Sequence, residues 1–266
     1  MELIFLGTGA GSGVPSFYCG CKACQEALAD SKYTRTRCAI ALLGDENILI
    51  DAPPELSRQL SREGIRDIDY LVLTHWHYDH VGGLGDLEFY VHLSRKKALP
   101  AFMSRETWTQ LQSFFVPVAD FLKVNLVEPG QVIEAGAVRL TPLAVAHTPG
   151  TLGFLIDCND RRIAYLPDTG QPPADTIERL HGIECLVLDA TFWGNNWYPE
   201  KHLSFNEAVA MGQSLEVKKL YLTHLSMHYD TPVTNSELER DIEPYGGKVQ
   251  MAYDGLRLSY GSLEGK

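Results

Sequence analysis

Short apolar runs that lead into a histidine or an aspartate recur along this chain. They occupy residues 70–73, 143–146, 163–167, 185–188 and 219–222, and the residues they lead to are His75, His147, Asp168, Asp189 and His224. Runs this short, rich in β-branched and aliphatic residues, favour buried strands over helices. Strands of the same direction end at one edge of a sheet, where α/β proteins commonly place their sites. We therefore expect these side chains to gather there.

The stretches between these runs predict helices and a hairpin. Residues 204–216 and 235–242 have amphipathic patterns, and Asn235 and Ser236 are capping residues ahead of the second one. Residues 40–51 read as two strands around a turn at 44–47. No internal repeat or Pro/Ser-rich linker divides the chain. The sequence thus predicts layered α/β with mixed sheets, in a single domain over residues 1–266.

Composition and charge narrow the class of protein. The chain has 266 residues, of which 45% are hydrophobic and 21% charged, as in an ordinary globular protein. No apolar run approaches the roughly 20 residues of a membrane span, and the first residues lack the basic region of a signal peptide, so we expect a cytoplasmic location. The net charge of −11 argues against a partner held mainly through polynucleotide phosphates. A small phosphorylated substrate stays compatible with it, because a metal centre supplies positive charge locally.

Four potential metal ligands stand directly after the first of these predicted strands. His75, His77, Asp79 and His80 lie within six residues. Side chains two apart in an extended segment share a side, so His75 and His77 can address one ion. The Asp79-His80 pair can then address a second. Imidazole and carboxylate ligands suit Zn, Mn or Fe. Chance clustering or helix capping is the plainer alternative.

The pattern His75-x-His77-x-Asp79-His80-x-Gly82-Gly83 resembles the signature of the metallo-β-lactamase superfamily, and His147, Asp168 and His224 follow in the order used there. The resemblance implies an αββα sandwich of two mixed β-sheets flanked by helices. It also implies that one ion is bound by His75, His77 and His147, that the other is bound by Asp79, His80 and His224, and that Asp168 bridges them. Taken singly, His147 and His224 could instead be buried strand ends, and Asp168 a turn former.

A further histidine points to one branch of that superfamily. The segment from Lys201 to Ala208 resembles a motif of its phosphodiesterase branch, which includes ribonuclease Z and the phosphoribosyl cyclic phosphodiesterases of phosphonate breakdown. An alkoxide that leaves phosphorus needs a proton, which a histidine near the metals can donate. His202 is therefore the candidate general acid and, with Asp79, the expected catalytic pair. Asp189 could orient His202; a surface histidine ahead of a helix is the alternative for His202.

The cysteines suggest a separate structural site. Cys19, Cys21 and Cys24 offer three thiolates at a spacing suited to one zinc ion. The phosphoribosyl cyclic phosphodiesterases have a similar cluster, completed by a histidine three residues after the last active-site histidine. This chain has Met227 there, and His228 follows one position later. A bulge or turn could absorb that residue, which makes His228 the candidate fourth ligand. Free thiols are the alternative.

Together these features predict a dinuclear metal-dependent phosphoric diester hydrolase. We expect two divalent ions, Mn or Zn, in the active site and one structural Zn. A metal-bridging hydroxide would attack a small cyclic phosphodiester such as phosphoribosyl 1,2-cyclic phosphate, with His202 as the acid. The chain lacks the long basic arm of ribonuclease Z, which disfavours nucleic acid; the resemblance also implies a homodimer. The alternatives are ribonuclease Z-like RNA processing, a lactonase or thioesterase, and a non-enzymatic accessory member, although no ligand is missing.

Overall fold

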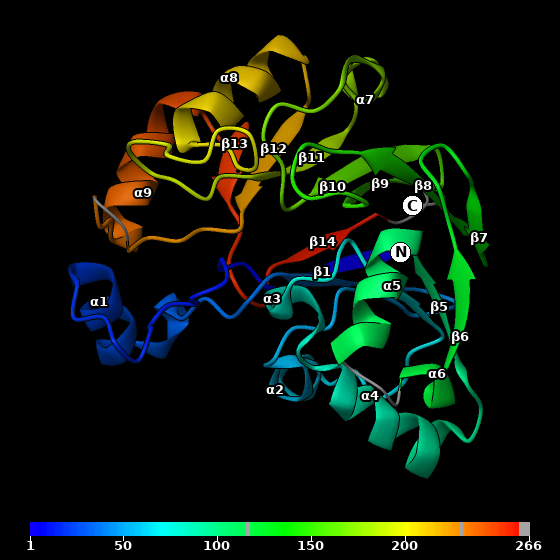
Figure 1. Ribbon diagram of the computed structural model, residues 1–266. Helices are drawn as coiled ribbons and strands as arrows, with labels where there is room; N and C mark the ends of the chain where they lie inside the picture. Colours follow the sequence, from blue (N-terminus) through cyan, green and yellow to red (C-terminus); the bar gives the residue numbers. More distant parts are fainter. Residues whose placement is uncertain (115–117, 229–230, 261–266) are drawn as a thin grey trace, which may run out of the picture.

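Two seven-stranded sheets, stacked face to face between layers of helices, make up the computed structural model, which describes residues 1–114, 118–228 and 231–260 (Figure 1). In the first sheet the order is β14-β1-β2-β3-β4-β5-β6, and in the second it is β13-β12-β11-β10-β9-β8-β7. Both sheets contain parallel and antiparallel pairs. This architecture confirms the predicted αββα sandwich.

The strands of the first sheet are β1 Glu2–Gly7, β2 Ala39–Leu43, β3 Ile48–Ile50, β4 Tyr70–Val72, β5 Leu99–Met103, β6 Leu122–Leu126 and β14 Arg257–Ser259. Those of the second are β7 Ile133–Ala135, β8 Val138–Ala144, β9 Leu152–Cys158, β10 Arg161–Leu166, β11 Cys185–Asp189, β12 Lys219–Thr223 and β13 Val249–Met251. The helices are α1 Lys22–Ala29, α2 Leu56–Glu63, α3 Tyr78–Val81, α4 Leu84–Tyr90, α5 Arg105–Phe114, α6 Val118–Phe121, α7 Ala174–Leu180, α8 Phe205–Ser214 and α9 Asn235–Ile242.

Continuous apolar runs form the central strands because both faces of each sheet are covered. In β1, Leu3 and Phe5 pack between the sheets, whereas Ile4 and Leu6 pack against the helices on the outer face. Helices α2 to α6 contribute to that outer core, and helices α1, α7, α8 and α9 contribute to the corresponding core on the second sheet. Successive side chains of a strand point to opposite faces, so a strand buried on both faces shows no polar alternation.

The predicted helices and hairpin are present with small shifts. Helix α8 begins after Ser204, which forms a capping box with Glu207. Helix α9 has the same device one residue earlier than the sequence suggested, because Thr234 and not Asn235 is its N-cap. Strands β2 and β3 form the hairpin at 40–51. Within the described ranges, no helix is both long and apolar enough to cross a bilayer.

Strand direction decides where the candidate residues gather. In the second sheet β10, β11 and β12 are parallel, and β8 points the same way because β9 lies antiparallel between it and β10. In the first sheet β3 and β4 are parallel. His147, Asp168, Asp189 and His224 therefore lie at or just beyond the carboxyl ends of four strands on one edge.

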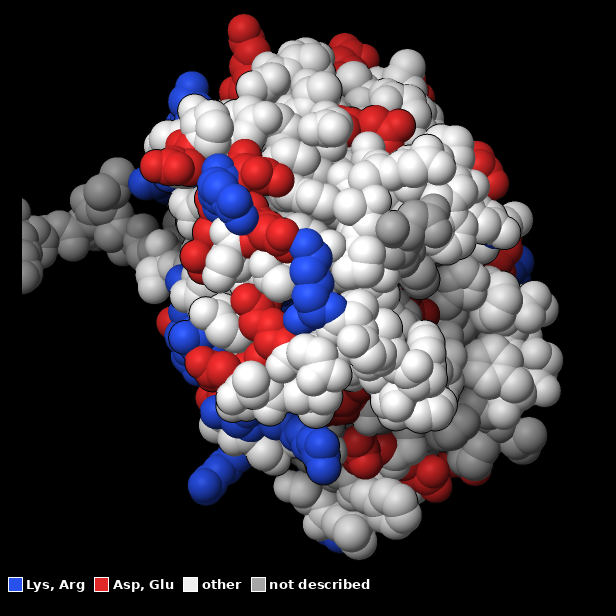
Figure 2. All heavy atoms as spheres, turned by 90° about the vertical axis from the view of Figure 1, so that its left-hand side faces the viewer, with Lys and Arg blue, Asp and Glu red and all other residues white. Residues whose placement is uncertain are grey.

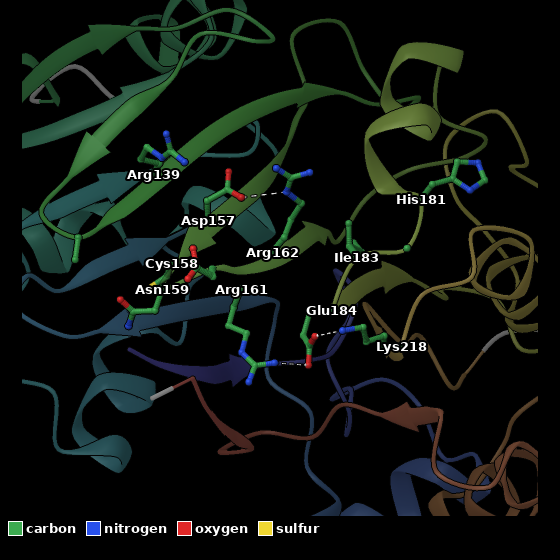
Figure 3. A pocket seen from close by; sticks show the side chains of 13 residues that line it. Arg139, Asp157, Cys158, Asn159, Arg161, Arg162, His181, Ile183, Glu184 and Lys218 are labelled. Atoms are coloured by element: carbon green, nitrogen blue, oxygen red, sulfur yellow. Dashed lines mark hydrogen bonds and ion pairs between the residues drawn. The ribbon is translucent and has the colours of Figure 1, made fainter. Parts of the chain in front are cut away.

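The opposite edge of the second sheet carries a different kind of polar surface. An open cleft of about 600 Å³ lies there, lined by Arg139, Arg161, Arg162 and Lys218 together with Asp157 and Glu184 (Figure 3). Charge is also interleaved elsewhere: on the face seen in Figure 2, basic side chains alternate with acidic ones along one side, and much of the rest is uncharged. Basic residues thus do not form a separate patch on that face.

Candidate metal centre

Three histidine nitrogens converge at the edge where β4 and β8 end. His77 Nδ1 lies 2.9 Å from His75 Nε2 and 3.1 Å from His147 Nε2. Ligands of a tetrahedral zinc ion, each about 2.0–2.1 Å from the metal, are about 3.3 Å apart. The three nitrogens therefore have nearly the spacing of three corners of such a site.

The hydrogen bonds on the far side of two of these rings set their tautomers. His75 Nδ1 lies 3.0 Å from the hydroxyl of Thr74, which itself donates to Asp51 at 2.9 Å. His147 Nδ1 lies 3.0 Å from the carbonyl oxygen of Lys201. Each Nδ1–H is thus a donor, which leaves the inward Nε2 with a lone pair. Burial lowers the pKa of His147 to about 4, so the ring is neutral and able to ligate near neutral pH.

Asp79, His80 and His224 form a second group beside the first. Their ligand atoms lie within 4.8 Å of one another, and Asp79 Oδ2 is 3.4 Å from His80 Nε2 and 3.5 Å from His224 Nε2. His80 donates through Nδ1 to Asp51 at 2.8 Å, and His224 through Nδ1 to Thr191 at 2.8 Å. Their Nε2 atoms are buried and have no hydrogen-bond partner among the described residues.

Asp168 lies between the two groups. Its Oδ2 is 3.1 Å from His80 Nε2 and its Oδ1 is 3.1 Å from His224 Nε2, and it also forms a close cluster with His75 and His80. Oδ2 is buried without a hydrogen bond from any described residue. Such orphaned buried atoms are costly unless a partner binds them. Their convergence fits a site for divalent cations, with Asp168 placed to contact both.

The charges around this pocket also favour the binding of a cation. Burial disfavours a charged His80, but the carboxylates of Asp168, Asp79 and Asp51 outweigh it and raise the pKa of His80 well above its ordinary value. The three carboxylates thus favour positive charge at this position, and a bound metal ion would supply it. Buried carboxylates of this kind are normally paired or coordinate metals.

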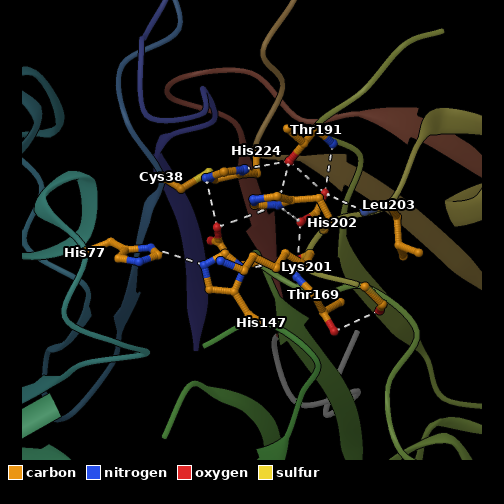
Figure 4. Close-up of polar contacts among 12 residues, drawn as sticks. Cys38, His77, His147, Thr169, Thr191, Lys201, His202, Leu203 and His224 are labelled. Atoms are coloured by element: carbon orange, nitrogen blue, oxygen red, sulfur yellow. Dashed lines mark hydrogen bonds and ion pairs between the residues drawn. The ribbon is translucent and has the colours of Figure 1, made fainter. Parts of the chain in front are cut away.

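His202 lies next to both groups without joining either triad. Its Nδ1 is 2.7 Å from Asp189 Oδ2 and 3.1 Å from Thr191 Oγ1, and its ring stacks on that of His224 at 5.3 Å (Figure 4). Burial opposes a charged ring, yet Asp189 outweighs burial and raises the pKa of His202 to about 9. Because Nδ1 is occupied, the Nε2–H is the group free to donate. Asp189 and His202 are brought together as the sequence suggested.

Two supporting residues were missed from the sequence. Asp51 accepts bonds from Thr74 and His80, and Thr191 bonds Asp189, His202 and His224. Asp51 follows the short apolar run 48–50, which is the same signal that marked His147 and Asp168. The hairpin pattern of residues 40–51 obscures that signal, because it explains the same apolar run without a functional role for Asp51. Thr191 carries no comparable signal.

The cysteine cluster meets His228 as predicted from the resemblance. The ligand atoms of Cys19, Cys21, Cys24 and His228 all lie within 4.8 Å of one another. His228 Nδ1 is 3.6 Å from Cys21 Sγ and 3.3 Å from Cys24 Sγ, while its Nε2 donates to the carbonyl of Gly13 at 2.6 Å. Met227, directly before His228, has a φ of +58°, so the chain turns at the position where the longer spacing needs a bulge or turn.

Two arginines near this loop have structural roles. Arg35 is buried and donates to Thr8, to Asn235 and to the carbonyl of Ala252. Arg37 pairs with Glu55 and donates to the carbonyl of Gly11 at 2.8 Å.

Comparison with known proteins places these residues in context. Residues 46–225 match the model of the beta-lactamase superfamily domain. The octanoyltransferase of Porphyromonas gingivalis is 29% identical over 96% of this chain, which spans about half of that longer protein (51%). Coenzyme PQQ synthesis protein B of Methylobacterium nodulans is 27% identical, over 97% of this chain and 99% of its own length. The crystal structure of a diphosphatase of the PhnP family superposes with a TM-score of 0.84 at 27% identity, covering 98% of both chains.

Proposed function

This chain belongs to the metallo-β-lactamase superfamily, and we propose that it is a dinuclear metal-dependent phosphodiesterase acting on a small, cyclic phosphodiester such as phosphoribosyl 1,2-cyclic phosphate. The fold and the buried His/Asp constellation are those of a metal-dependent hydrolase. The observation that carries the finer proposal is His202, a proton donor beside the ligands, with its Nδ1 held by Asp189.

Each residue of the site has a task in this proposal. His75, His77 and His147 would hold one ion, Asp79, His80 and His224 the other, and Asp168 would contact both. Two bound divalent ions would supply Lewis acidity for the phosphoryl oxygens and lower the pKa of a water molecule toward about 7. Thr74, Asp51 and Thr191 fix the orientation of the histidine rings through their Nδ1 atoms.

His202 would complete the reaction on the leaving-group side. Asp189 keeps its Nδ1 protonated and raises its pKa, so the ring carries a proton at neutral pH. The proton on Nε2 can be transferred to the departing sugar oxygen, which would otherwise leave as a strongly basic alkoxide. A thioesterase has less need for such a donor, since a thiolate is a weaker base than a sugar alkoxide.

A diphosphate is the second candidate substrate, favoured by the likeness to a diphosphatase at 27% identity over 98% of both chains. A phosphate leaving group is less basic than an alkoxide, so its departure depends less on a proton from His202. The same metal ligands would serve both reactions.

The test is a substrate panel with metal-depleted protein reconstituted with Mn or Zn. We expect hydrolysis of bis(p-nitrophenyl) phosphate and of cyclic phosphodiesters. Turnover of lactones or thioesters with every phosphodiester inert would overturn the proposal. Preference for a diphosphate over all cyclic esters would select the second candidate.

A further inference from the structure

A pocket beside the metal ligands combines side chains that stack on flat rings. It has a volume of about 420 Å³ and is lined by Gly11, Phe17, Tyr18 and Arg58, among others. A Cβ at Gly11 would lie only 3.2 Å from Asp79 Oδ2, so this wall of the pocket directly adjoins a candidate ligand. Pockets of this size bind small organic ligands.

The aromatic side chains of the pocket are held out in solvent. Phe17 is 101% exposed and Tyr18 is 69% exposed, and their rings pack edge to face with centroids 5.1 Å apart. The segment that carries them is anchored at the cysteine cluster, because Ser16 N donates to Cys24 Sγ at 3.3 Å and Cys19 N donates to the carbonyl of Ser16. Large apolar side chains presented together on a braced loop mark a binding surface.

The guanidinium of Arg58, in the same pocket, can also stack on a flat ring. Arg58 makes no ion pair within the part of the chain that the structure describes, unlike Arg37, which is paired with Glu55. Guanidinium planes and aromatic rings are the groups on which nucleobases stack. The cleft next to His147 contains Arg105 together with Glu106 and Glu128 and, among its described lining residues, no Phe, Tyr or Trp.

We propose that this pocket, with Phe17, Tyr18 and Arg58, receives the aromatic base of a nucleotide-type phosphodiester whose phosphate lies at the metal centre. The inference rests on the proposed function and names its substrate class. Phosphoribosyl 1,2-cyclic phosphate carries no such ring and would leave Phe17 and Tyr18 without a contact. A cyclic nucleotide uses the metal centre and the aromatic side chains together.

The experiment compares 2′,3′-cyclic AMP with phosphoribosyl 1,2-cyclic phosphate, using the Zn- or Mn-loaded protein and its Phe17→Ala and Tyr18→Ala variants. Both side chains are exposed, so the variants should fold. We expect kcat/KM for the cyclic nucleotide to fall about tenfold, mainly through KM, and the base-free substrate to change less than about twofold. Phe89→Ala is the matched control, since Phe89 is 66% exposed on α4 and does not line the pocket.

Binding of 2′,3′-cyclic AMP measured by calorimetry separates the two proposals. Base-dependent binding that weakens in Phe17→Ala, without hydrolysis of any phosphodiester, would refute the phosphodiesterase and leave the base site standing. Hydrolysis of both substrates with unchanged constants in both variants would refute the base site alone. A fall in sedimentation mass in either variant would identify the two rings as a contact between copies of this chain, and would also overturn the base site.

Discussion

The two ends of the second sheet hold charged side chains in opposite ways. At the carboxyl ends of its parallel strands, Asp168 and His224 are 2% and 3% exposed. Their buried atoms Asp168 Oδ2 and His224 Nε2, like His80 Nε2, have no hydrogen-bond partner among the residues that the structure describes. At the opposite end, Arg162 pairs with Asp157, while Arg161 and Lys218 share Glu184, at distances of 2.8–3.1 Å (Figure 3). These pairs are partly exposed.

The difference identifies the site better than the size of a cleft does. Exposed ion pairs are satisfied by each other and by water, and each contributes about 0–1 kcal/mol. Buried polar atoms that face one another without a partner are stable only if something else binds them. The cleft of about 600 Å³ at the arginine-rich end is therefore ordinary surface, and the crowded histidine end is where a cation belongs.

The largest effect is expected from Asp79→Ala. It removes one of the candidate ligands of the second group, a carboxylate that lies 3.4 Å from His80 Nε2 and 3.5 Å from His224 Nε2. Since even outer partners of metal ligands cost about 10–100-fold, we expect phosphodiesterase activity to fall more than about a thousandfold. Metal content, measured by plasma emission spectrometry, should drop by about one ion per chain. Full metal content with normal activity would remove Asp79 from the centre.

His202→Ala should lower kcat by about 10²–10⁴ without changing metal content. The effect should depend on the leaving group: large for a sugar alkoxide and small for p-nitrophenolate, which departs without a proton. Steady-state kinetics on paired alkyl and nitrophenyl diesters measure this difference. An equal loss on both would assign His202 a structural role instead of acid catalysis.

Asp51→Asn tests whether the hydrogen bonds that orient the candidate ligands contribute to metal affinity. Asp51 accepts from His80 at 2.8 Å and from Thr74, so its loss should weaken metal affinity about 10–100-fold. Competition with a fluorescent chelator gives the affinity. Unaltered affinity would mean that His80 and His75 are oriented by packing alone.

Cys21→Ser should release one zinc per chain and leave hydrolysis of bis(p-nitrophenyl) phosphate within a few-fold of the unmodified protein. The reason is that the cluster of Cys19, Cys21, Cys24 and His228 is separate from the His/Asp groups. Thiol titration with metal analysis checks this. If all three thiols of the unmodified protein alkylate freely and only two metals are present, the structural zinc does not exist.

Asp157→Asn should have the smallest effect. It breaks one exposed ion pair, with Arg162, and should change the free energy of unfolding by less than about 0.5 kcal/mol and leave kcat/KM unchanged. Urea denaturation and the same kinetic assay suffice. A loss of activity here would break the contrast between the two ends, because it would make the arginine-rich cleft part of the function.

The sequence by itself determined which residues gather at the candidate metal centre, since a histidine or aspartate that follows a short apolar run lies near the end of a strand, and these strands end at a common edge. His75, His77 and Asp79 form one such cluster within the chain, and the strand pattern predicted that His147, Asp168 and His224 would join it. The runs also determined the layered architecture, because strands buried on both faces lose their polar alternation.

Only the tertiary structure decided the roles that depend on distance between elements. Asp51 lies beside His80 because β3 and β4 are parallel neighbours, and Thr191 contacts His202, 11 residues away, and His224, 33 residues away. The burial of Arg35 likewise depends on distant segments, because its partners include Asn235 and Ala252. Periodicity reports which face of an element is apolar, whereas burial, tautomer and pKa depend on which elements pack beside it.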